Sequence, residues 1–374
     1  MDWDFFKELL SFDSTSGQER DVAEWLALRL PGMFPDANRP VLDVSEVGDG
    51  TLNLLLTWGT PRIVFCSHMD TVPPYIPPAA GTLPPDAPRH SRPISPRSPD
   101  TVSAGPPDDG RDVAESLSGP EIITGRGSCD AKGQIFAMVT ACRKLAESGC
   151  TDFGLLLLAG EETGSWGAKA FAKTDFRAPY LVVGEPTDNC MVSASKGTKS
   201  FGLTFTGEAF HSGYPQFGVS AVNLFVEFVN RLKEKDFGID PVLGETTWNI
   251  GLVHSDNPQN ILSPQLTCRL YFRTTFVSDE AVSAWMKEAG TPEGGAVTVI
   301  PRGGDTPATY WTVPGLASKP VAFGSDAPHL TNFTHKAICG PGSITVAHRD
   351  DEMVLAADLE KAVGQYIELY HATK

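Results

Sequence analysis

The sequence predicts an α/β protein that carries a smaller, inserted α+β domain. In the first half of the chain, apolar runs typical of buried strands alternate with helical patterns, which favours a sheet covered by helices. Polar residues directly follow several of these strands, and α/β folds place their sites at that edge of the sheet. From about residue 190 the strands instead alternate apolar with polar residues, as antiparallel strands with one solvated face do.

The larger domain is expected to begin with two helices, followed by strands that alternate with helices. Helical apolar spacing covers residues 2–11 and 18–30, and Pro31-Gly32 ends the second helix. The elements expected after them lie at residues 53–58, 62–66, 122–124, 131–148, 155–159, 168–173 and 180–183. The same pattern resumes at residue 322 and ends in a helix over residues 356–371.

Residues 73–120 differ in composition from the rest of the chain. They contain 13 of the 30 prolines, and no aromatic residue lies between positions 77 and 121. Such a segment cannot bury enough apolar surface to order itself. We therefore expect a mobile surface insertion at about residues 77–120.

The inserted domain is expected to follow the order strand, helix, strand, strand, helix, strand. Its alternating strands include residues 199–206, 265–275 and 296–301, and its helices are expected at 219–233 and 278–289. The sequence thus predicts a catalytic domain formed by residues 1–188 and 302–374, and an inserted domain formed by residues 189–301.

Composition and charge exclude several classes of protein. With 41% hydrophobic residues the 374-residue chain can bury a sizeable core, and it has no apolar run of the roughly 18–20 residues that a membrane span needs. The 46 acidic residues outnumber the 30 basic ones, so the net charge of −16 argues against nucleic-acid and membrane partners. The acidic start lacks the basic region of a signal peptide. Seven scattered cysteines without a CxxC pair favour a reduced, cytoplasmic protein.

His68 and Asp70 come at the end of an apolar strand. In an extended chain their side chains leave the same face, because they are two residues apart. Asp70 could then accept the second N–H of a metal-bound His68 and fix its tautomer. The alternative is an ordinary hydrogen bond between a histidine and an aspartate at a strand end.

Acidic and imidazole side chains also follow other strands and glycine turns. Asp130 lies in a glycine-rich turn at the start of a predicted helix, where it could equally be an N-cap. Glu161 and Glu162 follow a buried strand, and such crowded carboxylates need a cation nearby unless the turn is solvated. Glu185 follows the next buried strand, and His348 adds a second imidazole near the carboxyl end of the chain.

The coincidence of these residues predicts a metal centre. The carboxylates of Asp130, Glu162 and Glu185 and the imidazoles of His68 and His348 suit zinc, without the thiolates of a structural zinc site. Two divalent ions and one bridging hydroxide would balance three carboxylates, as in hydrolases whose two metal ions lie about 3.5–4 Å apart. Glu161, beside its ligand neighbour, could then act as the general base.

The motifs resemble those of the acetylornithine deacetylase and succinyl-diaminopimelate desuccinylase family, which contains di-zinc metallopeptidases and deacylases. The matching segments, in chain order, are His68-Met69-Asp70, Gly127–Gly133, Glu161-Glu162, Gly184–Thr187 and Ala347-His348. The segments Phe323–Leu330, Gly340–Ser343 and Ala347–Glu352 most resemble acetylornithine deacetylases. The resemblance implies a di-zinc exopeptidase-like catalytic domain with a mixed sheet between helices. It also implies a lid and dimerisation domain with a four-stranded antiparallel sheet and two helices.

The resemblance also implies how the metal ligands are shared. His68 and Glu185 would hold one zinc ion, Glu162 and His348 would hold the other, and Asp130 would bridge the two. In this arrangement Co²⁺ or Mn²⁺ are expected substitutes for Zn²⁺.

Further residues are assigned to catalysis and substrate binding by the same resemblance. Asp70 would orient His68, Glu161 would be the general base, and His211 would reach the opposite subunit's site and stabilise the oxyanion. The substrate-binding positions implied are Asn260, Arg273, Asp326 and Gly342. Of these, Arg273 could instead be a surface arginine, and Asp326 could equally cap a loop.

The implied activity is hydrolysis of the amide bond of a small-molecule N-acyl amino acid by a zinc-dependent homodimer. N-acetyl-ornithine, a substrate of arginine biosynthesis, is the leading candidate. A metallo-dipeptidase or a succinyl-diaminopimelate desuccinylase would use the same residues with a different acyl pocket. A metal-free binding protein on the same fold is the remaining alternative, but it would be expected to lose a ligand or the base, and this chain has all of them.

Overall fold

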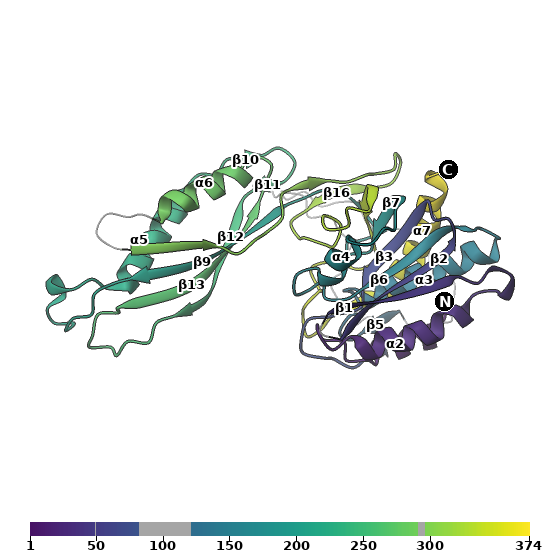
Figure 1. Cartoon of the computed structure of the whole chain (residues 1–374), viewed down its shortest axis with the longest axis horizontal. Helices are drawn as coiled ribbons and strands as arrows, with labels where there is room; N and C mark the ends of the chain where they lie inside the picture. Colours follow the sequence, from purple (N-terminus) through teal and green to yellow (C-terminus); the bar gives the residue numbers. More distant parts are fainter. Residues whose placement is uncertain (49, 82–120, 291–295) are drawn as a thin grey trace, which may run out of the picture. The chain divides into compact units, whose positions relative to one another are not determined.

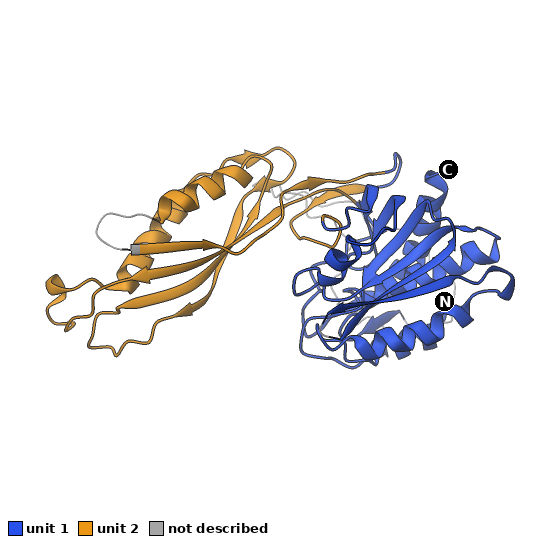
Figure 2. Cartoon of the chain, in the orientation of Figure 1, with its two compact units in different colours: residues 1–191, 313–317, 329–374 blue, residues 192–312, 318–328 orange. Residues whose placement is uncertain are grey.

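The computed structural model describes residues 1–48, 50–81, 121–290 and 296–374, and the chain divides into two compact units (Figure 1). Unit 1 comprises residues 1–191, 313–317 and 329–374, and unit 2 comprises residues 192–312 and 318–328 (Figure 2). Most of the predicted surface insertion, from residue 82 to residue 120, lies outside the described residues. Within the described parts of the chain, no helix is both long enough and apolar enough to cross a membrane.

Unit 1 is built on a six-stranded mixed sheet with the strand order β1-β2-β6-β3-β7-β17. The strands are β1 (Val41–Gly48), β2 (Thr51–Gly59), β3 (Ile63–His68), β6 (Asp152–Leu158), β7 (Ala178–Val183) and β17 (Phe333–Ile338). β1, β2 and β6 pair in antiparallel fashion, whereas β6, β3, β7 and β17 are parallel to one another. The α/β class and the mixed sheet predicted from the sequence are thereby confirmed.

The central strands are continuous apolar runs because they are covered on both faces. Every residue of β3 is buried, and so is every residue of β6 except Asp152 at its start. β1 differs, because it lies at the edge of the sheet and none of its residues is buried. Its mixed composition did not identify it as a strand, since an edge strand has little apolar surface to bury.

The helices of unit 1 pack on this sheet and on one another. They are α1 (Trp3–Leu10), α2 (Arg20–Arg29), α3 (Lys132–Glu147), α4 (Trp166–Phe171) and α7 (Ala356–Ala372). α3 contacts β3, β6 and α7, and α1 packs against α3 through the stacked rings of Phe6 and Phe136, whose centroids are 4.6 Å apart. α2 contacts β2, and α4 contacts β1 and β2.

A small antiparallel sheet joins three segments that are far apart in the sequence. Its strands, in the order β18-β5-β4, are β18 (Met353–Leu355), β5 (Ile122–Thr124) and β4 (Ala79–Gly81). Met353 pairs with Thr124, so the residue before β18 lies beside the residue after β5. This register places Glu352 next to the loop that leads to Asp130.

Unit 2 contains the predicted four-stranded antiparallel sheet, in the order β12-β13-β9-β14, with two helices. These elements are β9 (Gly197–Thr206), β12 (Thr247–His254), β13 (Gln265–Thr274), β14 (Ala296–Pro301), α5 (Ala221–Glu234) and α6 (Asp279–Ala289). Alternate residues of β9 and β13, such as Phe205 and Leu270, form one core with Phe228 of α5 and Met286 of α6. Both helices therefore cover the same face of the sheet, which explains the apolar and polar alternation in the sequence.

Several shorter strands were not predicted. β8 (Met191–Ser195), which begins at the end of unit 1, pairs in a three-stranded sheet with β15 (Ala308–Thr309) and β16 (Ser318–Val321). β10 (Ile239–Asp240) and β11 (Gly244–Glu245) form a two-stranded ribbon in unit 2. Runs of two to five residues are too short to show a clear period.

Candidate metal centre

Three strands of unit 1 bring acidic and imidazole residues to one edge of the sheet. β6, β3 and β7 are parallel neighbours, so their carboxyl ends lie together. His68 is the last residue of β3, Glu162 comes shortly after β6, and Glu185 comes shortly after β7. The strand order therefore explains why residues separated by more than one hundred positions share one location.

Two loops supply the remaining groups. Asp130 precedes α3, but the N-cap of that helix is Ala131, and no side chain caps it. The capping role that the sequence allowed for Asp130 is therefore wrong. His348 lies between β17 and β18 and has a left-handed backbone conformation, with φ of 62°.

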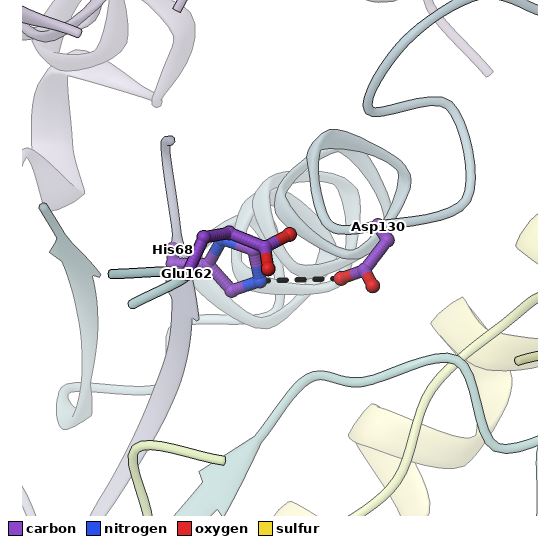
Figure 3. Close-up of side chains that lie close together, drawn as sticks. All are labelled: His68, Asp130 and Glu162. Carbon is purple, nitrogen blue, oxygen red and sulfur yellow. Dashed lines mark hydrogen bonds and ion pairs between the residues drawn. The ribbon is translucent and has the colours of Figure 1, made fainter. Parts of the chain in front are cut away.

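The Asp130 carboxylate lies between two imidazoles. Its Oδ1 is 3.2 Å from Nε2 of His68, and its Oδ2 is 3.3 Å from Nε2 of His348. Nε2 of His348 is also 3.0 Å from Oε1 of Glu162. One ligand atom from each of His68, Asp130 and Glu162 lies within 4.8 Å of the others (Figure 3).

Three of the four side chains in the cluster are shielded from solvent. The side chains of His68, Asp130 and Glu162 are 2%, 8% and 9% exposed, whereas that of His348 is 48% exposed. The crowded turn at Glu161 and Glu162 is thus not simply solvated, since the Glu162 side chain is nearly buried. His348 forms the open side of the cluster.

The electrostatics of the cluster favour positive charge. Hydrogen bonding to Asp130 and Glu162 raises the pKa of His348 to about 10. Burial opposes charge on His68, but hydrogen bonds to Asp130 and Asp70 outweigh it and raise the pKa of this imidazole well above its usual value. Burial likewise opposes charge on Asp130, yet the two histidines lower the pKa of its carboxyl. Burial raises the pKa of Glu162.

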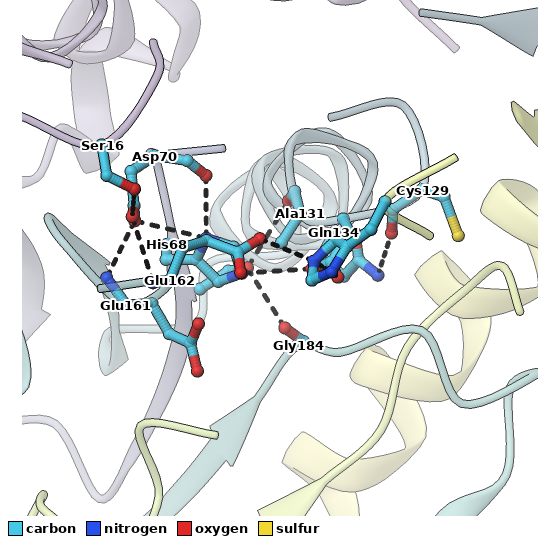
Figure 4. A network of polar contacts seen from close by, with 12 residues as sticks. Ser16, His68, Asp70, Cys129, Ala131, Gln134, Glu161, Glu162 and Gly184 are labelled. Carbon is cyan, nitrogen blue, oxygen red and sulfur yellow. Dashed lines mark hydrogen bonds and ion pairs between the residues drawn. The ribbon is translucent and has the colours of Figure 1, made fainter. Parts of the chain in front are cut away.

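Asp70 organises the strand end and the following turn. Its Oδ1 and Oδ2 accept the backbone N–H groups of Glu161 and Glu162 at 2.9 and 3.1 Å, and Oδ2 also accepts the Ser16 hydroxyl at 2.7 Å (Figure 4). Nδ1 of His68 is 3.0 Å from the Asp70 carbonyl oxygen and 3.4 Å from Oδ1. Burial would raise the pKa of Asp70, but these hydrogen bonds outweigh it and lower that pKa. Asp70 thus leaves Nε2 of His68 facing Asp130.

The residues present fit a divalent metal. Imidazole nitrogens and carboxylate oxygens are ligands for zinc and similar ions, and the cluster has no thiolate among its donors. A carboxylate between two imidazoles can use its two oxygens for two ions. Because the carboxylates of Asp130 and Glu162 lie 3.0–3.3 Å from the two imidazoles, the site favours added positive charge.

Glu161 lies near the cluster without belonging to the group of three, and Glu185 follows β7 at the same edge of the sheet. The side chains of Glu161 and Glu162 diverge, although the charge of Glu161 is close enough to help raise the pKa of His68, against the lowering effect of burial (Figure 4). Glu185 is buried. Gly342 has φ of 78°, and a Cβ there would lie 2.5 Å from Sγ of Cys129, so this position requires glycine for packing.

The other predicted site residues belong to unit 2, apart from Gly342. His211 and Asn260 are exposed and lie on adjoining segments, because the N–H of Ser212 donates to the Asn260 carbonyl at 2.9 Å. Arg273 is on β13, where its guanidinium lies 5.0 Å from the centre of the Tyr271 ring. Asp326 is buried within unit 2.

Sequence reasoning did not assign a role to three residues that contact the site. These are Ser16, which hydrogen-bonds to Asp70, and the buried pair Arg126 and Glu352. Arg126 and Glu352 each lie within four residues of a predicted ligand. That proximity was the only signal, since no spacing rule pairs residues 226 positions apart.

Comparison with known proteins identifies relatives over nearly the whole chain. Residues 193–291 match the peptidase dimerisation domain of the M20 family. A probable carboxypeptidase of Aspergillus niger is 30% identical over 98% of this chain and 88% of its own length. One of Emericella nidulans is 31% identical over the same shares of the two chains.

Solved structures share the fold. A tripeptidase from Staphylococcus aureus superposes with a TM-score of 0.74 at 18% identity, over 99% of this chain and 97% of its own. An M20 family metallo-carboxypeptidase from Sulfolobus solfataricus gives a TM-score of 0.65 at 15% identity, over 100% and 99%. At such low identity, the solved structures show that the fold is shared. Membership of the family is shown by the fungal relatives, at 30% and 31% identity.

Proposed function

The chain belongs to the M20 peptidase family and is a metal-dependent hydrolase, and we propose that it cleaves an amide bond next to a free α-carboxylate, as a carboxypeptidase of short peptides does. The observation that supports this proposal is the position of the Asp130 carboxylate, 3.2 Å from one imidazole and 3.3 Å from another. That geometry suits a carboxylate shared by two cations. The fungal relatives are named probable carboxypeptidases, which favours a peptide as substrate.

The proposed centre holds two zinc ions. His68 and Glu185 would hold one ion, Glu162 and His348 the other, and Asp130 would bridge them. When bound, the ions supply Lewis acidity that withdraws electrons from the scissile carbonyl. Asp70 orients His68 through Nδ1, which leaves Nε2 available as the ligand.

Glu161 is proposed to move the proton. Its carboxylate takes a proton from the attacking water and later donates the same proton to the nitrogen of the leaving amine. The hydrogen bond from its own N–H to Asp70 fixes the turn from which the side chain projects. The neighbouring Glu162 contacts His348, so Glu162 would be a metal ligand and Glu161 the general base.

Recognition of the substrate is assigned to unit 2 and to the glycine loop. Arg273 and Asn260 would bind the α-carboxylate, for which a planar guanidinium is well suited. His211, supplied by a partner subunit, would stabilise the oxyanion that forms at the scissile carbonyl. Gly342 would lie beside the substrate in the loop that precedes His348.

A substrate panel on zinc-loaded protein tests the proposal. Dipeptides and tripeptides with a free carboxyl terminus should be hydrolysed, whereas the same peptides with an amidated terminus should lose most of the activity, because Arg273 would have no carboxylate to bind. Liquid chromatography of the products identifies the bond that is cut. Equal hydrolysis of the free and amidated peptides would contradict the role of the α-carboxylate.

Deacetylation of N-acetyl-ornithine, and hence a role in arginine biosynthesis, is a second candidate. It is favoured by the segment Phe323–Leu330, whose acidic residue Asp326 could attract an amine. N-acetyl-ornithine and N-succinyl-diaminopimelate therefore belong in the same panel. Preference for N-acetyl-ornithine over every peptide would make deacetylation the principal activity.

A homodimer is proposed on the basis of the match to a dimerisation domain. If His211 acts in the partner's site, mixtures of Glu161→Ala and His211→Ala protein should regain activity after subunit exchange. Half of the dimers would then be mixed, each with one intact site, which gives about a quarter of the wild-type activity per chain. Unmixed variants are the controls. If subunit exchange is demonstrated and the mixture stays inactive, His211 does not act in the partner's site.

A further inference from the structure

We infer that the buried ion pair between Arg126 and Glu352 is a positioning device, which holds the loops carrying Asp130 and His348 at the separation required to bind two cations. The inference concerns the metal ligands of unit 1 and rests on the metal centre of the proposed function. The charged groups of Arg126 and Glu352 hydrogen-bond to backbone groups of the loops, and neither bonds to the side chain of His68, Asp130, Glu162 or His348.

Glu352 holds the loop of Asp130. Its Oε1 accepts the backbone N–H groups of Cys129 and Asp130 at 2.9 and 3.0 Å, and its Oε2 accepts Nη1 of Arg126 at 2.7 Å. The Glu352 carboxylate thus fixes two successive peptide N–H groups. The second belongs to Asp130, whose own carboxylate lies between the two imidazoles. A shift of Glu352 would move Asp130 with it.

Arg126 connects the same carboxylate to the loop of His348. Its Nη1 donates to the carbonyl of Arg349 at 3.1 Å as well as to Glu352, and its Nε donates to the carbonyl of Pro74 at 3.2 Å. Arg349 directly follows His348. The guanidinium therefore joins the segment after β3, the Asp130 loop and the His348 loop.

The conformation of His348 makes this contact important. A residue with a Cβ rarely adopts a φ of 62° unless its surroundings hold it there. The hydrogen bond from Arg126 to the next carbonyl is one restraint of that kind. The His348 side chain is 48% exposed, so hydrogen bonds to the loop backbone contribute to holding this conformation.

The Arg126 and Glu352 side chains are buried, and paired strands adjoin them. Each side chain is 1% exposed, and the antiparallel pairing of β18 with β5 places Glu352 and Gly125 side by side, with a backbone hydrogen bond of 3.1 Å. A buried ion pair is often no more stabilising than well-packed apolar residues in its place. Stability alone therefore gives a weak reason for burying these two charges beside a metal centre.

Zinc titration of the metal-stripped full-length protein tests the inference without any substrate. Glu352→Gln keeps the size of the side chain and removes its charge. We expect its affinity for zinc, measured by calorimetry, to fall about 10–100-fold, as is typical when a group that orients a ligand is lost. With Co²⁺ as the probe, the visible spectrum should change as well, because the ligand geometry changes.

The double variant Arg126→Met/Glu352→Leu separates positioning from folding. Apolar replacement of both charges leaves no buried charge unpaired, so the protein should keep its fold. Its melting temperature should fall, because the N–H groups of Cys129 and Asp130 and the carbonyls of Arg349 and Pro74 lose their side-chain partners. Its affinity for zinc should nevertheless be lower than that of the wild-type protein, because the N–H groups of Cys129 and Asp130 have lost their acceptor. This variant also provides the test if Glu352→Gln fails to fold.

Arg62→Met is the matched control. Arg62 forms an ion pair with Asp152 at 2.6 Å, at the amino ends of β3 and β6, which is the edge of the sheet opposite the cluster. Its loss should affect stability and leave zinc affinity unchanged. Folded variants of the Arg126 and Glu352 pair with wild-type zinc affinity and cobalt spectrum would overturn the inference. If the wild-type protein binds zinc and cleaves no tested amide, the proposed function fails and the positioning role remains testable.

Discussion

Glu161→Gln is expected to lower kcat by about 10³-fold while leaving the binding of two zinc ions intact. The glutamine has the same shape but cannot accept a proton from water or return it to the leaving amine. The backbone N–H of Glu161, which donates to Asp70 at 2.9 Å, is unaffected by the change. The loss should therefore appear in kcat, measured with the best substrate of the panel, and much less in KM.

Glu162→Gln is the matched control at the adjacent position. Glu162 is 3.0 Å from His348 and belongs to the compact group with His68 and Asp130, so its loss should weaken zinc binding. Metal analysis after dialysis distinguishes the two variants. Loss of metal from Glu161→Gln and its retention by Glu162→Gln would mean that the roles of the two residues are exchanged.

Asp130→Asn is expected to reduce activity by about 10³-fold or more and to prevent the binding of a pair of ions. The amide keeps the volume of the carboxylate but supplies one oxygen instead of two and no negative charge. Both imidazoles, at 3.2 and 3.3 Å from the carboxylate, would lose their common partner. Lewis acidity worth several kcal/mol in the transition state is lost with the ions, which accounts for the expected factor.

The melting temperature provides a second measurement for Asp130→Asn. Zinc at 100 times its dissociation constant should stabilise the wild-type protein by about 2.7 kcal/mol, or roughly 5–10 °C for a domain of this size. The same zinc concentration should leave the melting temperature of Asp130→Asn nearly unchanged. Asn257→Ala, a change in unit 2, is a control that should keep the full zinc-dependent shift. A wild-type shift in Asp130→Asn would contradict the bridging role.

Much of the fold follows from local patterns along the chain. The buried runs at β3 and β6, the helix α3 and the one-sided strands β9 and β13 were all expected close to their observed bounds. β3 and β6 are continuous apolar runs because both of their faces are covered, whereas β9 and β13 alternate because only one face is covered. β1 and β8 were missed, since an exposed edge strand and a five-residue strand lack such a period.

The candidate site was predictable in its residue types but only partly in its contacts. Polar residues after buried strands indicated His68, Glu162 and Glu185, because parallel strands end at one edge of a sheet. The sequence left open whether the Asp130 side chain caps a helix or binds a metal. In the structure it caps no helix and contacts the imidazoles of His68 and His348. The choice between these partners depends on how loops distant in sequence pack together.

The amino acids themselves predicted the chemistry of the metal ligands. Carboxylates and imidazoles suit divalent cations wherever the fold places them. The assembly that holds them was decided only by tertiary structure. Arg126 meets Glu352 across 226 positions, and Ser16 meets Asp70 across 54. Partners of this kind are chosen by burial, because a charge or hydroxyl removed from water must bond to whatever group the folded chain brings beside it.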